Sequence, residues 1–174
     1  YYSTKPYQTS DTSTSNNQTR TTKDNNANYA FKHFVKNGIP KVVAAGIVAN
    51  LYHENLGNPE QTISDSRGTT SYGIACFNSK GELNNLRNFA KANGLKDLGM
   101  DTQLNFLTYV AKTRLPELLR ATTPEDASFI FGRDFEKFAG KDGKGYKNPD
   151  DPEHIRRKNT AKKLYNQYKS WIEY

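Results

Sequence analysis

A glutamate at the end of an apolar helix is the residue of this chain best placed for acid–base chemistry. Val43, Ile47 and Leu51 recur at every fourth position, and this spacing predicts one buried face of a helix. Glu54 follows three residues after Leu51, on the same face, where polar, loop-like sequence begins. A carboxyl group in such a position is partly removed from water, which favours its protonated form. The position therefore fits a general acid, and it fits a solvated or capped glutamate at a helix end equally well.

Asp65 is the candidate for a second carboxylate. It lies in the polar segment after this helix, between Ser64 and Ser66. Enzymes that cleave glycosidic bonds commonly use two carboxyl groups, one to protonate the leaving oxygen and one to stabilise the charged transition state or activate water. A turn residue explains Asp65 as well, because an aspartate side chain accepts hydrogen bonds from nearby backbone N–H groups. Both interpretations stay open at this point.

Other titratable residues carry no pattern for a metal or a cofactor. Histidine, cysteine and acidic residues do not cluster with ligand spacing, and Asp142-Gly143 lacks the rest of a calcium loop. Cys76 is the single cysteine, so it cannot form an intrachain disulfide, and its surroundings predict a small buried residue rather than a nucleophile. Glu136 is interpreted as structural, in an ion pair with a basic residue of the last helix. We expect no metal and no cofactor.

The elements that position Glu54 are mainly helical. Periodicity and capping residues predict helices over about 28–37 and 40–56, followed by several more. The last two cover about 127–138, which opens on the start signal Thr123-Pro124, and about 152–172. Residues 61–77 lack helical periodicity and are rich in Thr, Ile and Tyr around a Ser-Arg-Gly turn. This segment predicts a small, irregular β-hairpin. The expected architecture is mainly α with a minor β part.

The first 28 residues differ in composition from the rest. From Gln8 to Asn28, 16 of 21 residues are Ser, Thr, Asn or Gln, and none has a large apolar side chain. Such a segment buries too little surface to offset its ordering entropy. We therefore predict a polar linker or extended arm over 1–28 and one folded domain over 29–174, tethered as part of a longer or processed polypeptide. No apolar run is long enough to cross a bilayer, so we expect no membrane contact.

Several motifs around Glu54 are similar to those of one known family. The runs AAGIVANLYHENLGNP (44–59) and SYGIACF (71–77) resemble the helix end and the following motif of the phage tail lysozyme family of peptidoglycan-cleaving domains. The resemblance continues in order over about 28–168. Asn55, Cys76 and Phe77 depart from the family pattern, which has Ser, Gln and Trp at these positions. The departures weaken any inference about substrate contacts there and leave Glu54 unaffected.

The resemblance implies a lysozyme-like α+β fold in which residues 61–77 form one wall of the substrate cleft. It implies Glu54 as the acid/base that cleaves peptidoglycan glycan strands, as a muramidase or a lytic transglycosylase. Tyr72 and Gly73 would line the cleft floor, and Gln103 would face either the cleft or solvent. The implied location is the virion, in the phage tail, where the arm contacts other tail proteins and the domain acts on the host cell wall at infection.

The net charge of +7 predicts binding to polyanions. Basic residues gather in the C-terminal half, where they form either a solvated helix face or a binding surface for anionic wall polymers. Specific nucleic-acid binding is not expected, because no recognition helix or RNA-binding motif is present. The alternative to an enzyme is a non-catalytic structural or glycan-binding tail domain with the same fold. The departure from the family pattern at Cys76 leaves this alternative open.

Overall fold

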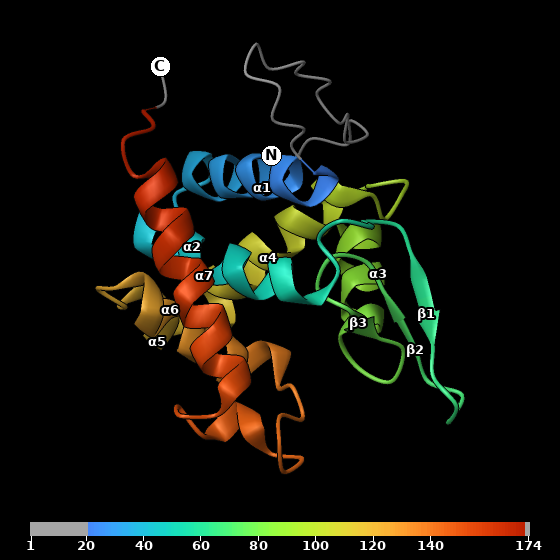
Figure 1. The fold of residues 1–174 in the computed structure, drawn as a ribbon. Coiled ribbons are helices and arrows are strands. Elements are labelled where there is room, and N and C mark those ends of the chain that lie inside the picture. The colour runs from blue at the N-terminus through green and yellow to red at the C-terminus, as the bar shows by residue number, and fades with distance from the viewer. Residues whose placement is uncertain (1–20, 173–174) are drawn as a thin grey trace.

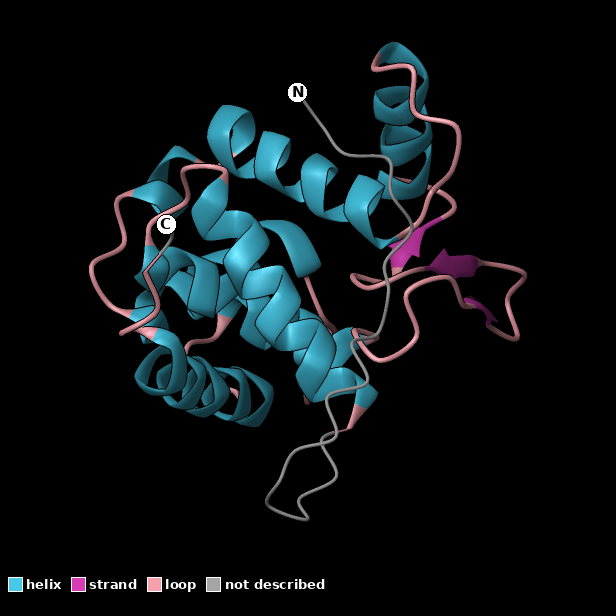
Figure 2. Cartoon of the chain, turned by 90° about the horizontal axis from the view of Figure 1, so that it is seen from above, coloured by secondary structure: helices cyan, strands magenta, loops and turns pink. Residues whose placement is uncertain are grey.

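Helices build most of this molecule, and a small antiparallel sheet lies at one side of them (Figure 1). The computed structural model describes residues 21–172. Viewed from above, the strands are grouped beside the helices (Figure 2). This confirms the predicted mainly α architecture with a small β part. The helices are α1 (Thr22–Lys36), α2 (Lys41–Glu54), α3 (Glu82–Ala92), α4 (Met100–Arg114), α5 (Pro116–Leu119), α6 (Pro124–Phe131) and α7 (Pro152–Tyr168), and the strands are β1 (Thr62–Ser64), β2 (Thr70–Tyr72) and β3 (Phe77–Asn78).

Helix α2 lies in the centre of the helical part. Its residues from Val43 to Leu51 are all buried, and it contacts α1, α6 and α7. A helix that is covered on all sides is apolar all round, which is why the sequence shows small and apolar residues in an unbroken run here. At Gly46 a Cβ atom would lie 2.5 Å from the Ala127 Cβ of α6. The glycine therefore lets the backbones of α2 and α6 approach closely.

Helix α1 begins earlier than its composition suggests. The predicted start was about Asn28, but the helix starts at Thr22, and Thr21 caps it by accepting a hydrogen bond from the Asp24 N–H at 3.1 Å. The Asn26 side chain donates to the Leu56 carbonyl at 2.7 Å in the buried interior. Short polar side chains cap helices and form hydrogen bonds with buried backbone. The polar composition before Asn28 therefore led to a predicted helix start that was too late. Residues 1–20 of the predicted arm lie outside the described residues.

The sheet forms the β-lobe, which comprises residues 61–78. Strand β1 pairs antiparallel with β2, with Thr62 opposite Tyr72, and β2 pairs antiparallel with β3. This confirms the predicted β-segment after α2. The lobe is joined to the end of α2, because the Asn55 N–H donates to the Ile74 carbonyl at 3.2 Å. The turn between β2 and β3 therefore lies against the helix end that carries Glu54.

Helix α6 starts as predicted, with Thr123 as its cap and Pro124 in its first turn. It continues directly into a π-helical turn, η1 (Gly132–Glu136), which ends at Lys137 in the left-handed conformation with φ of 51°. A loop containing the short helix η2 (Gly145–Lys147) then leads to α7, which packs against both α2 and α6. The C-terminal half thus brings η1 and α7 to the same end of α2.

Candidate active site

Glu54 is the last residue of α2, and its carboxyl group contacts an arginine of α7. The Glu54 Oε1 lies 2.7 Å from the Arg157 Nη2, and the two side chains are 17% and 4% exposed. The expected partial removal of Glu54 from water is therefore confirmed. A buried cation, rather than apolar surface alone, lies beside the carboxyl. An arginine in this position stabilises the carboxylate that remains once a proton has left.

Arg157 is itself held by a network that joins three helices. Its Nε donates to the Glu153 Oε1 at 2.9 Å, and its Nη1 donates to the Asn50 Oδ1 at 3.0 Å. The Asn50 Nδ2 donates in turn to the Ser128 carbonyl of α6 at 3.0 Å, and the guanidinium lies 4.5 Å from the centre of the Phe138 ring. Sequence reasoning missed this role of Arg157. The available signal was the i, i+4 pair with Glu153 on one helix face.

Two further titratable side chains, Cys76 and Glu136, lie close to Glu54. The Cys76 thiol donates a hydrogen bond to Glu54, and burial together with the charges of Glu54 and Glu136 raises the thiol pKa to about 12. A thiol with this pKa stays protonated near neutral pH and is a poor nucleophile. Cys76 therefore acts as a neutral hydrogen-bond donor to Glu54, in the position where the family pattern has glutamine.

Glu136, at the end of η1, lies in a different environment from Glu54. Its Oε1 is buried and has no hydrogen-bond partner in the described part of the chain. Burial, followed by the charge of Glu54, raises the pKa of Glu136 well above its usual range, while Arg157 opposes the shift. The predicted ion pair with a basic residue of the last helix is not formed among the described residues: Arg157 pairs with Glu54 and Glu153 instead.

Asp65 lies in the exposed turn between β1 and β2. Its Oδ1 accepts hydrogen bonds from the N–H groups of Arg67 and Thr69, each at 2.9 Å. These two bonds lower the pKa of the Asp65 carboxyl. The geometry is that of an aspartate that stabilises a turn. The structure therefore favours the turn interpretation and does not place Asp65 among the groups that act on Glu54.

Gly73 and Gln103 lie close together, and they contact each other rather than an open cleft. Gln103 is fully buried: its Oε1 accepts from the Ile74 N–H at 2.8 Å, and its Nε2 donates to the carbonyls of Pro59 and Leu98. Gly73 has φ of 78°, and a Cβ there would lie 2.2 Å from the Gln103 Oε1. Gln103 thus neither faces a cleft nor is solvated. It fastens the β-lobe to α4, and Gly73 is needed for the close approach.

Tyr72 is a half-buried residue of β2 beside this contact. Its hydroxyl donates to the Leu98 carbonyl at 2.9 Å, the same oxygen that accepts from Gln103. The side chain thereby ties the lobe to the segment that precedes α4. Part of the tyrosine remains accessible at the lobe surface, so a contact with substrate stays a prediction for this residue.

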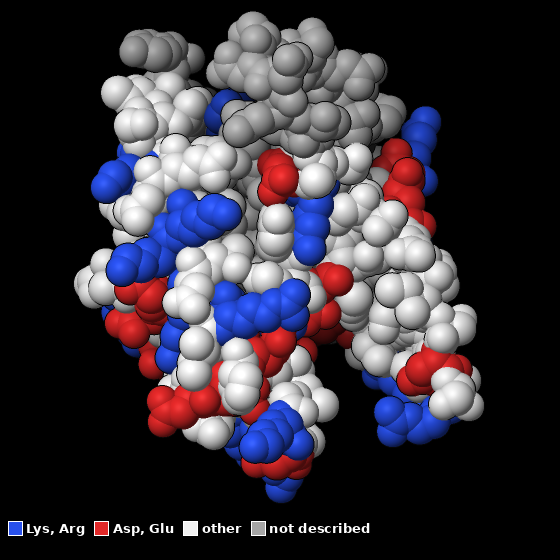
Figure 3. All heavy atoms as spheres, viewed as in Figure 1, with Lys and Arg blue, Asp and Glu red and all other residues white. Residues whose placement is uncertain are grey.

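A notch separates the β-lobe from the C-terminal segment that contains η1 and the start of α7. In the space-filling view it opens toward the bottom of the molecule, and acidic side chains lie at its inner end (Figure 3). The elements on its two sides are those that contribute Cys76 and Glu136 next to Glu54. A long chain molecule could lie in a notch of this kind and reach the end of α2.

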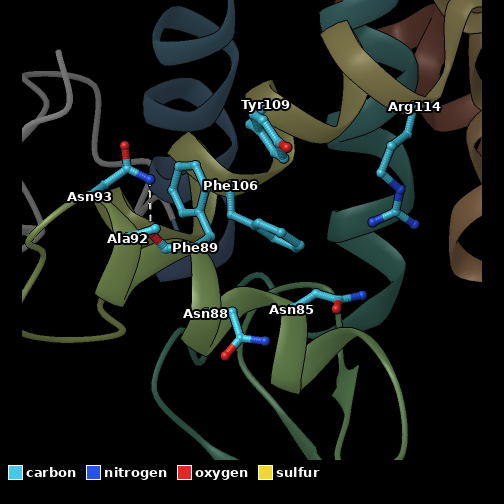
Figure 4. Close-up of a pocket in the computed structure, with 8 residues that line it drawn as sticks. All are labelled: Asn85, Asn88, Phe89, Ala92, Asn93, Phe106, Tyr109 and Arg114. Atoms are coloured by element: carbon cyan, nitrogen blue, oxygen red, sulfur yellow. Dashed lines mark hydrogen bonds between the residues drawn. The ribbon is translucent and has the colours of Figure 1, made fainter.

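A second hollow, of about 570 Å³, lies between α3 and α4 (Figure 4). Aromatic side chains from both helices and amide side chains from α3 and its C-terminal end line it, together with Ala92 and, at one end, Arg114. Arg114 is ion-paired with Glu82 at 2.9 Å, and its guanidinium lies 6.0 Å from the centre of the Phe135 ring, next to Glu136. The lining residues include no carboxyl group.

A comparison with protein families shows which family the chain belongs to. A family model described as phage tail lysozyme matches residues 25–168, which is nearly the whole described chain. The chain belongs to the phage tail lysozyme family. The match includes α2 with Glu54, the β-lobe, η1 and α7, so every element of the site lies inside it. The family connects the domain with peptidoglycan and with a phage tail. No curated protein sequence matched the chain.

Two further properties of the described residues concern metal binding and membrane spans. They contain no group of three or more histidine, cysteine, aspartate or glutamate side chains arranged to hold a metal ion. Within the same residues, every helix is too short or too polar to pass through a membrane.

Proposed function

We propose that this phage tail lysozyme domain cleaves the glycan strands of peptidoglycan, with Glu54 as the general acid/base. The observation that carries the proposal is the pairing of Glu54 with the buried Arg157 at the end of α2. Hydrogen bonds that join three helices fix the Glu54–Arg157 pair, and the turn between β2 and β3 lies against the same end of α2. Family membership supports peptidoglycan as the substrate class.

The proposed reaction begins with proton transfer from Glu54 to the glycosidic oxygen. The bond between that oxygen and the anomeric carbon breaks, and the sugar takes on positive charge. The Glu54 carboxylate that forms lies against the Arg157 guanidinium, with which it makes an ion pair of 2.7 Å in the structure. Glu54 then removes a proton from the attacking group, either water or the 6-hydroxyl of the same muramic residue. Water yields a new reducing end, and the internal hydroxyl yields a 1,6-anhydro sugar.

Substrate positioning and location belong to the same proposal. The β-lobe is one wall of the cleft, and Tyr72 contacts the glycan from that wall. The domain acts from the phage tail on the host wall at infection, with the N-terminal arm as its contact to other tail proteins. Basic side chains over the C-terminal helices, shown in blue in Figure 3, attract anionic wall polymers to the same surface.

Digestion of purified peptidoglycan tests the proposal. Wild type, Glu54→Gln and the matched control Glu125→Gln are incubated with walls from several bacteria, and the products are read by mass spectrometry. General acid–base catalysis contributes at least about 100-fold to a rate. We therefore expect wild type and Glu125→Gln to release fragments and Glu54→Gln to be slower by at least this factor.

The products and the controls decide among the possibilities. Reducing ends identify a hydrolase, and 1,6-anhydro ends identify a lytic transglycosylase. Equal release by wild type and Glu54→Gln would assign the acid to another residue. Binding of both proteins to walls without any release would support the non-catalytic tail domain instead.

A further inference from the structure

The hollow between α3 and α4 has the size and the lining of a binding site for a small ligand. Its volume of about 570 Å³ falls within the range of about 300–1,000 Å³ that is usual for such sites. Rings from both helices line it: the centres of Phe89 and Tyr109 are 5.4 Å apart, and Phe106 lies 5.5 Å from Phe89 (Figure 4). Glu54 is not among the lining residues, so the hollow is a second place at which a ligand could be held.

Tyr109 is exposed in a part of α4 that is otherwise buried. The residues from Met100 to Thr108 are all buried, as are Val110 and Ala111, whereas Tyr109 is 43% exposed. An aromatic ring left open to water beside a hollow presents a flat apolar face to a ligand. Sugar rings carry apolar C–H faces that pack on aromatic rings. The exposed tyrosine therefore fits a sugar as the ligand of the hollow.

Helix α3 presents asparagines to the hollow, although asparagine is a poor helix former. Asn85 and Asn88 lie one turn apart on α3, Asn93 follows as its C-cap, and all three line the hollow. Asn85 donates to the Glu82 Oε1 at 3.0 Å, and Asn93 donates to the Phe89 carbonyl at 2.8 Å. The Asn88 side chain is exposed and has no hydrogen-bond partner among the described residues. A residue that opposes local propensity without a structural role is expected at functional sites.

The charge of the hollow selects the kind of ligand. Arg114 is the one charged residue among those that line it, and its Nη1 and Nη2 donate to the two carboxylate oxygens of Glu82 at 3.1 and 2.9 Å. A guanidinium that is already paired in this way leaves little net charge for an acidic ligand. An asparagine amide both donates and accepts hydrogen bonds, as the acetamido group of an N-acetylated sugar does. The lining therefore fits an uncharged N-acetylated sugar.

We propose that the hollow binds an N-acetylglucosamine-type residue of a glycan strand, with Tyr109 against the sugar ring and Asn88 bonded to its acetamido group. The hollow adjoins the β-lobe, because the ring centres of Phe106 and Phe77 of β3 are 5.8 Å apart, and Phe77 directly follows Cys76. One strand can therefore be held in the hollow while it is cut beside the lobe. This role in cleavage rests on the proposed function, whereas sugar binding does not.

Titration with triacetylchitotriose, an uncharged oligomer of N-acetylglucosamine, tests the binding by ¹H–¹⁵N nuclear magnetic resonance. We expect shifts of the Asn88 side-chain amide and of the backbone around Tyr109. Tyr109→Ala should weaken binding by about fivefold and Asn88→Ala by about threefold, while Tyr109→Phe keeps the ring and should bind like wild type. Asn159→Ala, at an exposed position of α7, is the matched control. Alanine is the better helix former, so Asn88→Ala should fold as wild type does.

The positions of the shifts separate this inference from the proposed function. Shifts near Glu54 alone, or equal affinity of Tyr109→Ala and wild type, would overturn sugar binding in the hollow and leave the proposed function intact. Shifts in the hollow caused by a peptidoglycan stem tetrapeptide, and not by the sugar, would overturn it by assigning the hollow to a peptide. Sugar binding in the hollow by a wild type that releases no fragments from any wall would support the inference and contradict the proposed function.

The role of the hollow in cleavage has its own readout. With a wild type that releases fragments, Tyr109→Ala should raise the KM for peptidoglycan by about fivefold, and more than it lowers kcat, because the strand is held less tightly. Tyr109→Phe should restore the wild-type KM. An unchanged KM in a folded Tyr109→Ala variant would overturn the role of the hollow in holding the strand.

Discussion

The two sides of the notch are stabilised by different kinds of contact. On the helical side, a network of side chains from α2, α6 and α7 surrounds Glu54, and its members Asn50 and Arg157 are almost completely buried. On the other side, β1 is exposed along its whole length, and one glutamine of α4 makes three hydrogen bonds to backbone in and around the lobe. The acid is therefore fixed within the core, while the wall is attached at a few points. Changes on the first side should affect global stability, and changes on the second should affect the wall alone.

The largest effect is expected for Gly46→Ala in the helical side. The new Cβ would lie 2.5 Å from the Ala127 Cβ and 2.6 Å from the Ser128 backbone nitrogen, so α2 and α6 must move apart. Overpacking of this kind costs about 3 kcal/mol. Urea denaturation measures the loss. Gly57→Ala is the control, because its Cβ would have its nearest contact at 3.6 Å, and equal stability of the two variants would contradict the close packing of α2 and α6.

A smaller and more local effect is expected for Gln103→Leu. The change removes the partners of the Ile74 N–H and the Pro59 carbonyl and one of the two partners of the Leu98 carbonyl, and we expect a loss of about 2 kcal/mol. Hydrogen exchange should accelerate in the β-lobe and remain slow in α2, and the KM for peptidoglycan should rise more than kcat falls. Gln167→Leu, at an exposed position of α7, should behave like wild type. Equal acceleration in α2 and the lobe would show that the two sides are not separable.

The helices were predictable because their causes are local. The spacing of Val43, Ile47 and Leu51 and the Thr123-Pro124 start signal each depend on neighbours in the sequence, and the structure confirms both. The start of α1 was not predicted, since Asn26 is stabilised by the carbonyl of Leu56, 30 residues away. A long-range hydrogen bond leaves no periodic pattern in the sequence.

The partial burial of Glu54 was predictable, and its pairing with Arg157 was not. Glu54 stood out because polar sequence begins at the end of an apolar stripe. The family resemblance gave Gln103 a choice between cleft and solvent, whereas the side chain is fully buried beneath Gly73. The contact of Arg157 with Glu54 spans 103 residues and follows from how α7 packs on α2. Pairing of this kind is a property of the fold rather than of any segment.

The smallest effect is expected for Asp65→Asn, at the tip of the wall. The asparagine oxygen can still accept from the N–H groups of Arg67 and Thr69, so the turn should persist. Because the pKa of Asp65 is lowered on folding, the charge stabilises this turn at neutral pH and stops doing so as pH falls through the folded value. We expect cleavage rates within about twofold of wild type at pH 7, whereas removal of a second catalytic carboxylate costs at least about 100-fold. Steady-state cleavage rates distinguish these two outcomes. A loss of about 100-fold in a folded Asp65→Asn variant would show that a residue of the β-lobe takes part in the chemistry.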